Sequence, residues 1–199
     1  MGTDRPLRVG IFVFDDAEEL DVVGPYEVLA SWAQHSELRP EVVTFSTDGG
    51  GVRLAKGLRL VPDLSADDVG PLHVLLYPGG RGTRRLATDS AHLAWVRAMR
   101  ARTPLMTSVC TGALVYAAAG LLAGRPVTTH WSAFEELGAL DPSTLPDTEA
   151  RFVDDGDVVT SAGVSAGIDM ALHLVARLES VEMARGVRRG IQYDPAPPV

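Results

Sequence analysis

The chain has 199 residues and a formal net charge of −8 at pH 7, and 46% of its residues are hydrophobic. This composition is ordinary for a globular protein, and we expect residues 1–199 to form a single domain. The acidic balance and the scattered Lys and Arg residues argue against nucleic acid or an anionic membrane as a partner. The single cysteine excludes an intrachain disulfide and a cysteine-rich zinc site.

The amino-terminal sequence and the hydropathy pattern indicate a cytoplasmic protein. The first ten residues, MGTDRPLRVG, lack the charged-then-apolar pattern of a signal peptide. No apolar run approaches the roughly 18–20 residues that are needed to span a bilayer.

Short apolar runs rich in β-branched residues predict strands that are covered on both faces. Two further segments, each divided by a glycine turn, predict small hairpins. The expected strands are residues 7–14, 40–47, 73–77, 105–109 and 127–129, and the expected hairpins are residues 52–62 and 151–161.

Helices are expected between these strands. The first runs to about His35 with Pro25 in its first turn, because proline suits that position. Asp89 or Ser90 caps a second helix that ends near Arg102. The remaining expected helices are residues 113–122, 131–137, 168–178 and 184–191. This alternation predicts a flavodoxin-like α/β three-layer sandwich with a mostly parallel sheet, whose sites lie beyond the carboxyl ends of the strands.

Cys110 is the first candidate for a reactive group. It follows a predicted strand and precedes a small apolar helix that begins after Thr111 and Gly112. A side chain at this turn projects from the sheet near the first amides of the helix, which stabilise negative charge. We therefore expect a nucleophilic thiolate with a pKa below the reference value of about 8.5. The alternative is that Cys110 is simply a small buried apolar residue.

Histidines and carboxyl groups are both candidates for the proton partner of this cysteine. Only His130, in TTHW after a predicted strand, is a candidate for the pocket. Four other histidines fit surface or core positions: His35, His73, His92 and His173. Asp21 is the best carboxyl candidate, because its apolar frame in the loop before the first helix predicts partial burial and a raised pKa. It could instead cap that helix, and Glu18 and Glu19 are alternatives that look more exposed.

Gly79 and Gly80 follow the predicted strand at residues 73–77 and permit a close backbone approach. With the amide of Thr111, their amides would form an anion-stabilising hole. Glycines after a strand are also common turn formers. The chain contains no GxGxxG, HExxH or aspartate-glycine calcium loop, so we expect no dinucleotide or metal site.

These motifs together resemble the ThiJ/PfpI superfamily, which has the class I glutamine-amidotransferase-like fold. The combination of TSVCTG, LDVVGP and TTHW resembles, within it, the branch of the isonitrile (isocyanide) hydratases. The matching segments span nearly the whole chain: LDVVGP, YPGG, TSVCTG, AAGLLAGR, TTHW, SAGVSAGIDMAL and DPAPP.

The resemblance implies a homodimer that acts on a small molecule without a metal or organic cofactor. The implied reaction adds water to an isonitrile, R–N≡C, and gives an N-substituted formamide. Cys110 would be the nucleophile and Asp21 the acid that protonates the attacked carbon. Thr111 would contribute its amide and hydroxyl, Gly80 would contribute an amide, and the loop around Val164 would border the pocket.

Three functions stay open. The first is isonitrile hydration, and the second is hydration or hydrolysis of another small electrophile such as an α-oxoaldehyde. The third is a non-catalytic sensor of oxidants or ligands that uses Cys110. Thr111 follows the cysteine where protease-like relatives have histidine, which argues against a peptidase. The same motifs occur in the ligand-sensing domain of AraC-type regulators, but we expect no DNA-binding role.

Overall fold

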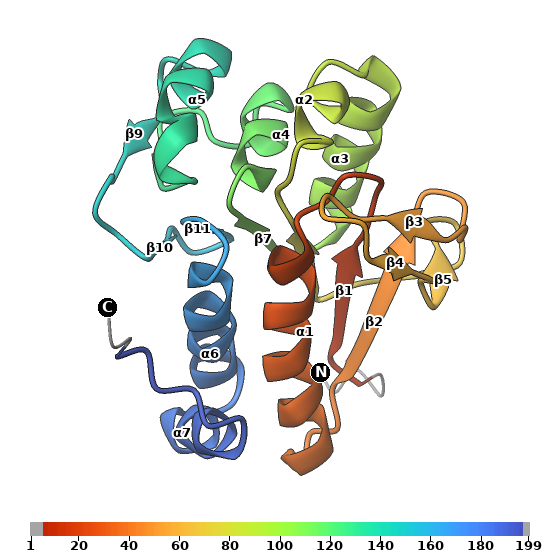
Figure 1. Cartoon of the computed structure of the whole chain (residues 1–199), viewed down its shortest axis with the longest axis vertical. Coiled ribbons are helices and arrows are strands. Elements are labelled where there is room, and N and C mark those ends of the chain that lie inside the picture. Colours follow the sequence, from red (N-terminus) through yellow and green to blue (C-terminus); the bar gives the residue numbers. More distant parts are fainter. Residues whose placement is uncertain (1–5, 197–199) are drawn as a thin grey trace.

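The centre of the molecule is a seven-stranded sheet, seen in a computed structural model that describes residues 6–196. The strands follow the order β10-β11-β7-β6-β1-β2-β5, and only the pair β10–β11 is antiparallel. They are β1 (Arg8–Phe12), β2 (Glu41–Ser46), β5 (Leu64–Ser65), β6 (Val74–Tyr77), β7 (Leu105–Val109), β10 (Phe152–Asp154) and β11 (Val158–Ser161). The predicted mostly parallel α/β sheet is therefore confirmed (Figure 1).

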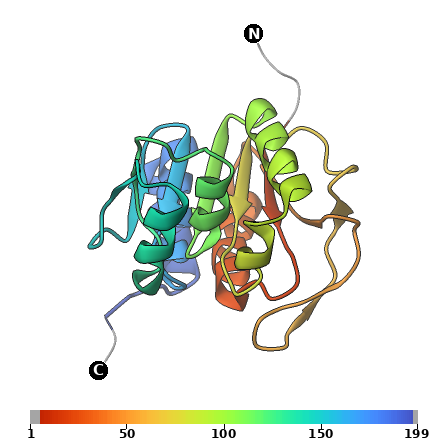
Figure 2. The same cartoon turned by 90° about the horizontal axis from the view of Figure 1, so that it is seen from above.

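Helices cover both faces of this sheet (Figures 1 and 2). One layer consists of α1, α6 and α7, which pack on one another, and the other contains α2 to α5. The helices are α1 (Glu19–His35), α2 (Thr83–Leu86), α3 (Ser90–Arg102), α4 (Gly112–Ala118), the 3-10 helix η1 (Trp131–Ala133), α5 (Phe134–Leu140), α6 (Ala166–Leu178) and α7 (Val181–Gly190). Within the part of the chain that the structure describes, no helix combines the length and apolar character required to cross a bilayer.

Two short pairs of strands lie outside the main sheet. β3 (Val52–Arg53) and β4 (Arg59–Leu60) form an antiparallel hairpin, as the sequence predicts. β8 (Pro126–Val127) and β9 (Leu145–Pro146) are parallel, and β9 lies in a segment that has the composition of a loop.

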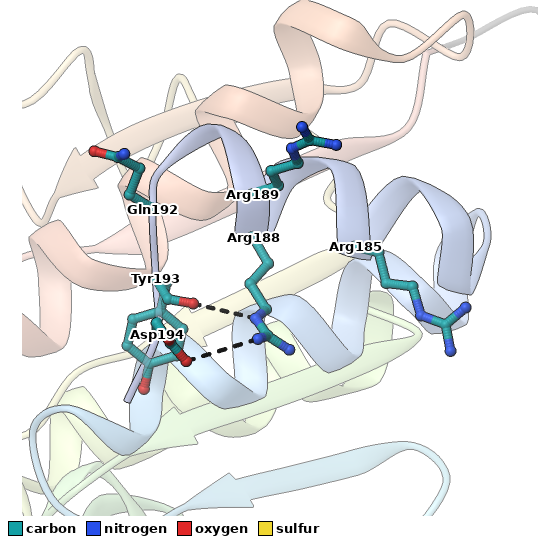
Figure 3. Close-up of a pocket in the computed structure, with 6 residues that line it drawn as sticks. All are labelled: Arg185, Arg188, Arg189, Gln192, Tyr193 and Asp194. Atoms are coloured by element: carbon teal, nitrogen blue, oxygen red, sulfur yellow. Dashed lines mark hydrogen bonds and ion pairs between the residues drawn. The ribbon is translucent and has the colours of Figure 1, made fainter. Parts of the chain in front are cut away.

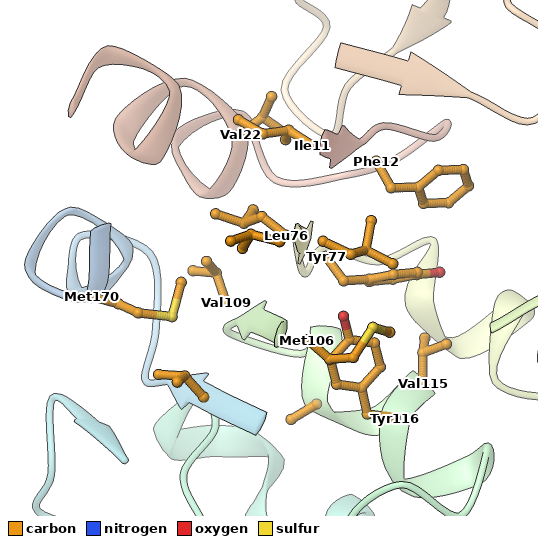
Figure 4. Packing of buried hydrophobic residues seen from close by; sticks show 14 of the residues in the cluster. Ile11, Phe12, Val22, Leu76, Tyr77, Met106, Val109, Val115, Tyr116 and Met170 are labelled. Carbon is orange, nitrogen blue, oxygen red and sulfur yellow. The ribbon is translucent and has the colours of Figure 1, made fainter. Parts of the chain in front are cut away.

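Strand side chains alternate between the two helical layers, and both faces of the sheet are buried (Figure 4). Ile11 points toward Val22 of α1, whereas its neighbour Phe12 points to the opposite layer. On that side the ring of Tyr77 lies 5.3 Å from Phe12 and 5.6 Å from Tyr116. Burial on both faces explains why the strands are continuous apolar runs, each large side chain contributing about 1.5–3 kcal/mol.

The amino end of α1 differs from the prediction. The helix begins at Glu19, so Pro25 is its seventh residue and Asp21 lies in its first turn rather than in the preceding loop. A proline at this position has no N–H to donate to the carbonyl oxygen of Asp21. The helix tolerates it because Pro25 and its neighbour Gly24 are buried, with Gly24 close against Ile168 of α6.

The other differences are in short or terminal elements. α4 ends at Ala118, although the sequence predicts a helix over residues 113–122. The predicted helix at residues 131–137 is divided into η1 and α5, and α2 and β5 are not predicted. Asp89 is confirmed as the cap of α3, since its side chain accepts hydrogen bonds from Ala91 N and His92 N. The last residues of the DPAPP segment lie outside the described range.

Candidate functional site

Cys110 lies at the sharp turn between β7 and α4, with a φ of 56°. This left-handed conformation is uncommon for a residue other than glycine. Hydrogen bonds from distant segments hold the turn: Cys110 N donates to Ser161 O at 3.0 Å, and Thr129 Oγ1 donates to Cys110 O at 2.8 Å. A side chain at Gly112 would lie 2.5 Å from the carbonyl oxygen of Tyr77, so only glycine allows α4 to start this close to β6.

The Cys110 thiol is buried, with 6% of the residue exposed. Burial raises its pKa to about 12, and negative charge on Asp21 acts in the same direction. The amides of Thr111 and Val164 and the hydroxyl of Thr111 oppose this rise. The sequence-based prediction of an acidic thiol is therefore wrong. The helix amides act on the sulfur as predicted, but loss of solvation outweighs them.

Asp21 is fully buried, which exceeds the partial burial that its apolar frame predicts. Its Oδ2 accepts a hydrogen bond from Gly79 N at 2.9 Å, whereas Oδ1 is buried and has no hydrogen-bond partner among residues 6–196. Burial raises the pKa of Asp21 to about 7; the charge of Glu18 also raises it, while the hydrogen bond from Gly79 and the nearby Cys110 thiol lower it. The capping alternative is not supported, because the side chain bonds to the loop after β6 instead.

Asp21 and Cys110 form a pair that can exchange one proton. Both pKa values are raised, and each group contributes to the shift of the other. A proton that leaves the sulfur can pass to the carboxylate, which gives a thiolate beside a neutral acid. The arrangement therefore combines a thiol with a carboxyl group that can first accept a proton and then donate it.

The amides of Gly79 and Gly80 are already used within this site. Gly79 N donates to Asp21, and Gly80 N donates to Thr111 Oγ1 at 2.9 Å. The predicted anion-stabilising hole is therefore wrong for these two glycines, because acceptors from α1 and from the Cys110 turn occupy their amides. The amides that face the sulfur belong to Thr111 and Val164.

Gly79 itself has no space for a side chain. A Cβ there would lie 2.8 Å from Asp21 Oδ2, 2.8 Å from Cys110 Cβ and 2.5 Å from Thr111 N. We expect Gly79→Ala to lower the free energy of unfolding by about 1–3 kcal/mol, as other overpacked substitutions do. Urea unfolding measures this loss. The matched control is Gly138→Ala in α5, where nothing lies within 4 Å; it should be neutral or stabilising, and equal effects of the two substitutions would contradict the prediction.

Thr111 connects the Cys110 turn to the glycine loop. Its Oγ1 accepts from Gly80 N and also lies 3.2 Å from Gly80 O and from Thr83 Oγ1. The hydroxyl thus fixes the distance between the glycine loop and the Cys110 turn. Thr83 lies on the short helix α2, and no motif in the sequence identifies it as a residue of this site.

The backbone amide of Val164 lies at the site, its backbone is strained, and its predicted place beside a substrate stays a prediction. Its φ of 48° is rare for a β-branched residue. This conformation accompanies the placement of its amide against the sulfur of Cys110. The signal that was missed is therefore the backbone of Val164 rather than its side chain.

His130 lies beside the same loop. Its Nδ1 is 2.8 Å from Ser132 Oγ and caps η1, and its ring packs against Gly163, where a Cβ would be 3.1 Å from Nε2. No contact between His130 and Cys110 is described, so its pocket role stays a prediction. In the TTHW motif it is Thr129 that bonds directly to the Cys110 turn, through the carbonyl oxygen of Cys110.

The other histidines have partners outside the site. His35 bonds Ser31 O, His73 accepts from Arg8 N, His92 bonds the buried Tyr77 hydroxyl, and His173 bonds Asp154. Burial lowers the pKa of His92 to about 4, so this ring is neutral at pH 7.

A separate surface groove lies at the end of α7 (Figure 3). Arg188 there bonds the carbonyl oxygen of Tyr193 and pairs with Asp194. The groove is lined by Arg185, Arg188, Arg189, Gln192, Tyr193 and Asp194. It shares no residue with the Cys110 site.

The fold and the site define a class of parallel α/β proteins that hold a cysteine at a strand-to-helix turn beside a buried carboxyl group. The chain belongs to the DJ-1/PfpI (ThiJ/PfpI) family, which it matches over residues 7–177. It is 38% identical over 192 residues to the isonitrile hydratase of Pseudomonas putida, covering 96% of this chain and 81% of that protein.

Two further relatives show how widely this domain is used. The chain is 30% identical to the HTH-type transcriptional regulator GbdR of Pseudomonas aeruginosa, covering 96% of this chain and 52% of that protein. A crystal structure of a ThiJ/PfpI family protein from Pseudomonas syringae matches with a TM-score of 0.88 and 33% identity, over 98% of this chain and 78% of that chain.

Proposed function

We propose that this protein hydrates a small electrophile, and that the substrate is an isonitrile converted to an N-substituted formamide. The observation that carries the proposal is that the sole cysteine and the fully buried Asp21 meet at Gly79, where a Cβ would lie 2.8 Å from both Asp21 Oδ2 and Cys110 Cβ. The 38% identity to an isonitrile hydratase supports the choice of substrate.

The first step adds the thiol across the terminal carbon of R–N≡C. Asp21 accepts the proton from Cys110 and then donates it to that carbon, which becomes electrophilic as the thiolate forms the C–S bond. The product is a thioimidate, R–N=CH–S–Cys, and Asp21 is again a carboxylate. Hydrogen-bonding groups of Thr111 and Val164 stabilise negative charge on the sulfur during this step.

The second step consumes water. Asp21 accepts a proton from water as the oxygen adds to the thioimidate carbon, and it passes this proton to the nitrogen, so that Asp21 is again a carboxylate. The resulting R–NH–CH(OH)–S–Cys loses its C–S bond, and the hydroxyl proton returns to the sulfur through Asp21. The products are R–NH–CHO and the free thiol of Cys110, so one isonitrile and one water give one formamide.

Mass spectrometry in ¹⁸O-labelled water tests the proposal. The protein is incubated with alkyl and aryl isonitriles, and we expect formamides that carry one oxygen from the solvent. Cys110→Ala is the control, because it reports the hydration that occurs without the thiol, both in solution and with Asp21 alone. Equal formamide formation by the wild type and Cys110→Ala would remove the proposal.

A ligand sensor is the second candidate, because the chain also aligns with the transcriptional regulator GbdR. Within this alternative, a sensor of oxidants is disfavoured by the thiol itself. Oxidant-sensing cysteines are accessible and have a low pKa, whereas Cys110 is buried and its pKa is raised. Hydration of another electrophile such as an α-oxoaldehyde would use the same pair of residues.

We also propose that the chain works as a homodimer. Leu20, Val23 and Tyr26 follow one another at three-residue intervals along α1, and each exposes between 38% and 41% of its surface. This apolar stripe begins next to Asp21, and a second copy of the chain would bury it.

A further inference from the structure

The β3–β4 hairpin is fastened to the segment that leads into α1 (Figure 1). Asp16 N donates to Arg53 O at 2.8 Å, and Ala55 N donates to Ala17 O at 2.8 Å. Arg53 N donates in turn to the carboxylate of Asp15 at 2.8 Å. The hairpin pairs with no strand of the main sheet, so these bonds fix its position against the start of α1.

The tip of the hairpin places a positive charge against two carboxylates. Lys56 Nζ pairs with Glu18 Oε1 and lies 3.9 Å from Glu19 Oε2. The backbone amide of Lys56 donates to Glu19 Oε1 at 2.6 Å, and the amide of Leu58 lies 3.4 Å from the same oxygen. The side chains of Glu18 and Glu19 are each 17% exposed, so they are more exposed than the fully buried Asp21, as the sequence predicts, although the hairpin covers part of their surface.

This ion pair is adjacent to the catalytic carboxyl. Glu18 N donates to Gly79 O at 2.9 Å, while Gly79 N donates to Asp21 Oδ2. One glycine therefore fixes both Glu18 and Asp21 relative to Cys110. Glu18 and Asp21 are three residues apart, which places them on the same side of the helix start.

The charged and titratable groups that act on Asp21 come from three elements. Glu18 belongs to the segment before α1, Lys56 to the hairpin, and Cys110 to the turn between β7 and α4. The charge of Glu18 raises the pKa of Asp21, and that of Lys56 lowers it. Farther out, Arg81 pairs with Asp16 at an exposed position.

We propose that Lys56 is a positioning residue for the Asp21–Cys110 pair and that it acts through Glu18. The hairpin brings the ammonium group to Glu18 and thereby balances the negative charge beside the catalytic carboxyl. The catalytic meaning of this balance rests on the proposed function. The charge balance itself is a property of the folded protein and can be measured without an isonitrile.

Thiol alkylation provides that measurement, because Cys110 is the only cysteine in the chain. The rate of reaction with iodoacetamide is followed by intact mass from pH 5 to pH 9. The rate should rise as the Asp21–Cys110 pair loses its first proton, because the singly protonated pair then includes a minor form with a thiolate beside a neutral acid. In the wild type this step should lie near pH 7, where Asp21 titrates.

The two partners of the ion pair should shift this step in opposite directions. Lys56→Met removes the positive charge and should move the midpoint to higher pH by about half a unit, the size expected for one partly exposed charge. Glu18→Gln removes the negative charge and should move it to lower pH by a similar amount. The double variant should return close to the wild-type midpoint.

Two controls separate this effect from a loss of structure. Lys56→Arg keeps the charge and should keep the wild-type midpoint. Arg59→Met removes another exposed cation of the same hairpin and should leave the midpoint unchanged. A hairpin with only a structural role would give Lys56→Met and Glu18→Gln the same effect or none, and either result would overturn the proposal. Absence of formamide from the wild type would overturn the proposed function but not this one.

Discussion

Cys110→Ser is expected to abolish isonitrile hydration, with kcat lowered by at least about 10³-fold. A serine hydroxyl fits the same turn and the same backbone hydrogen bonds, so the fold and the substrate site should be retained. Asp21, with a pKa of about 7, cannot deprotonate a hydroxyl to the extent that it can deprotonate a thiol. The variant therefore removes the thiol while it keeps the fold, so a loss of turnover reports the loss of the nucleophile. Formamide release is followed by chromatography under saturating isonitrile.

Ser108→Ala is the matched control for this experiment. Ser108 lies two residues earlier in β7, is fully buried, and its hydroxyl has no hydrogen-bond partner within the described residues. Its removal should leave turnover near that of the wild type. If Cys110→Ser kept more than a tenth of wild-type turnover while remaining cooperatively folded, Cys110 would not be the nucleophile.

The sheet was predictable because its strands are buried on both faces. The runs that became β1, β2, β6 and β7 are continuous apolar segments bounded by turn residues, which is a strong local signal. β5 and β9 have two residues each, and α2 has four, so none is long enough to show a periodic pattern, whereas β8 overlaps the strand predicted at residues 127–129. The start of α1 was misplaced because Pro25 is typical of a first turn, while tertiary packing against α6 carries it in the seventh position.

Cys110 and Asp21 could be predicted as members of the candidate site, but Thr83 and the electrostatics of the site could not. Cys110 and Asp21 were identified from a turn and an apolar frame, both of which are local features. The pKa of the thiol depends on how much solvent the packed chain removes, and no local pattern reports that. The amides of Gly79 and Gly80 donate to acceptors that are 58 and 31 residues away in sequence. No local pattern could therefore show that these amides are not free to form the predicted anion hole.

Asp21→Asn is expected to slow turnover by about 10²–10⁴-fold, the usual contribution of a positioned proton-transfer group. The amide can still accept the hydrogen bond from Gly79 N, so the backbone around Cys110 should be kept. It can neither accept the thiol proton nor protonate the isonitrile carbon. The variant should also lack the step near pH 7 in the alkylation profile of Cys110. Unchanged turnover would assign Asp21 to a structural role.

The same substitution should change how stability depends on pH. The pKa of Asp21 is about 7 in the folded protein, against 3.8 for the unperturbed group. Between these values the unfolded chain releases a proton that the folded protein retains, so the free energy of unfolding of the wild type falls as the pH rises from 4 to 7. About three pKa units at about 1.4 kcal/mol each amount to on the order of 4 kcal/mol.

Asp21→Asn removes this loss, because its side chain does not titrate. Relative to the wild type, the variant should therefore gain on the order of 4 kcal/mol in the free energy of unfolding between pH 4 and pH 8. Urea unfolding of both proteins at the two pH values measures the gain, and Asp67→Asn, at an exposed carboxylate, provides the surface control. If the pKa of Asp21 in the folded protein were close to 3.8, the free energies of unfolding of Asp21→Asn and Asp67→Asn would depend on pH in the same way. In that case the buried acid on which the proposed proton transfer depends would not exist.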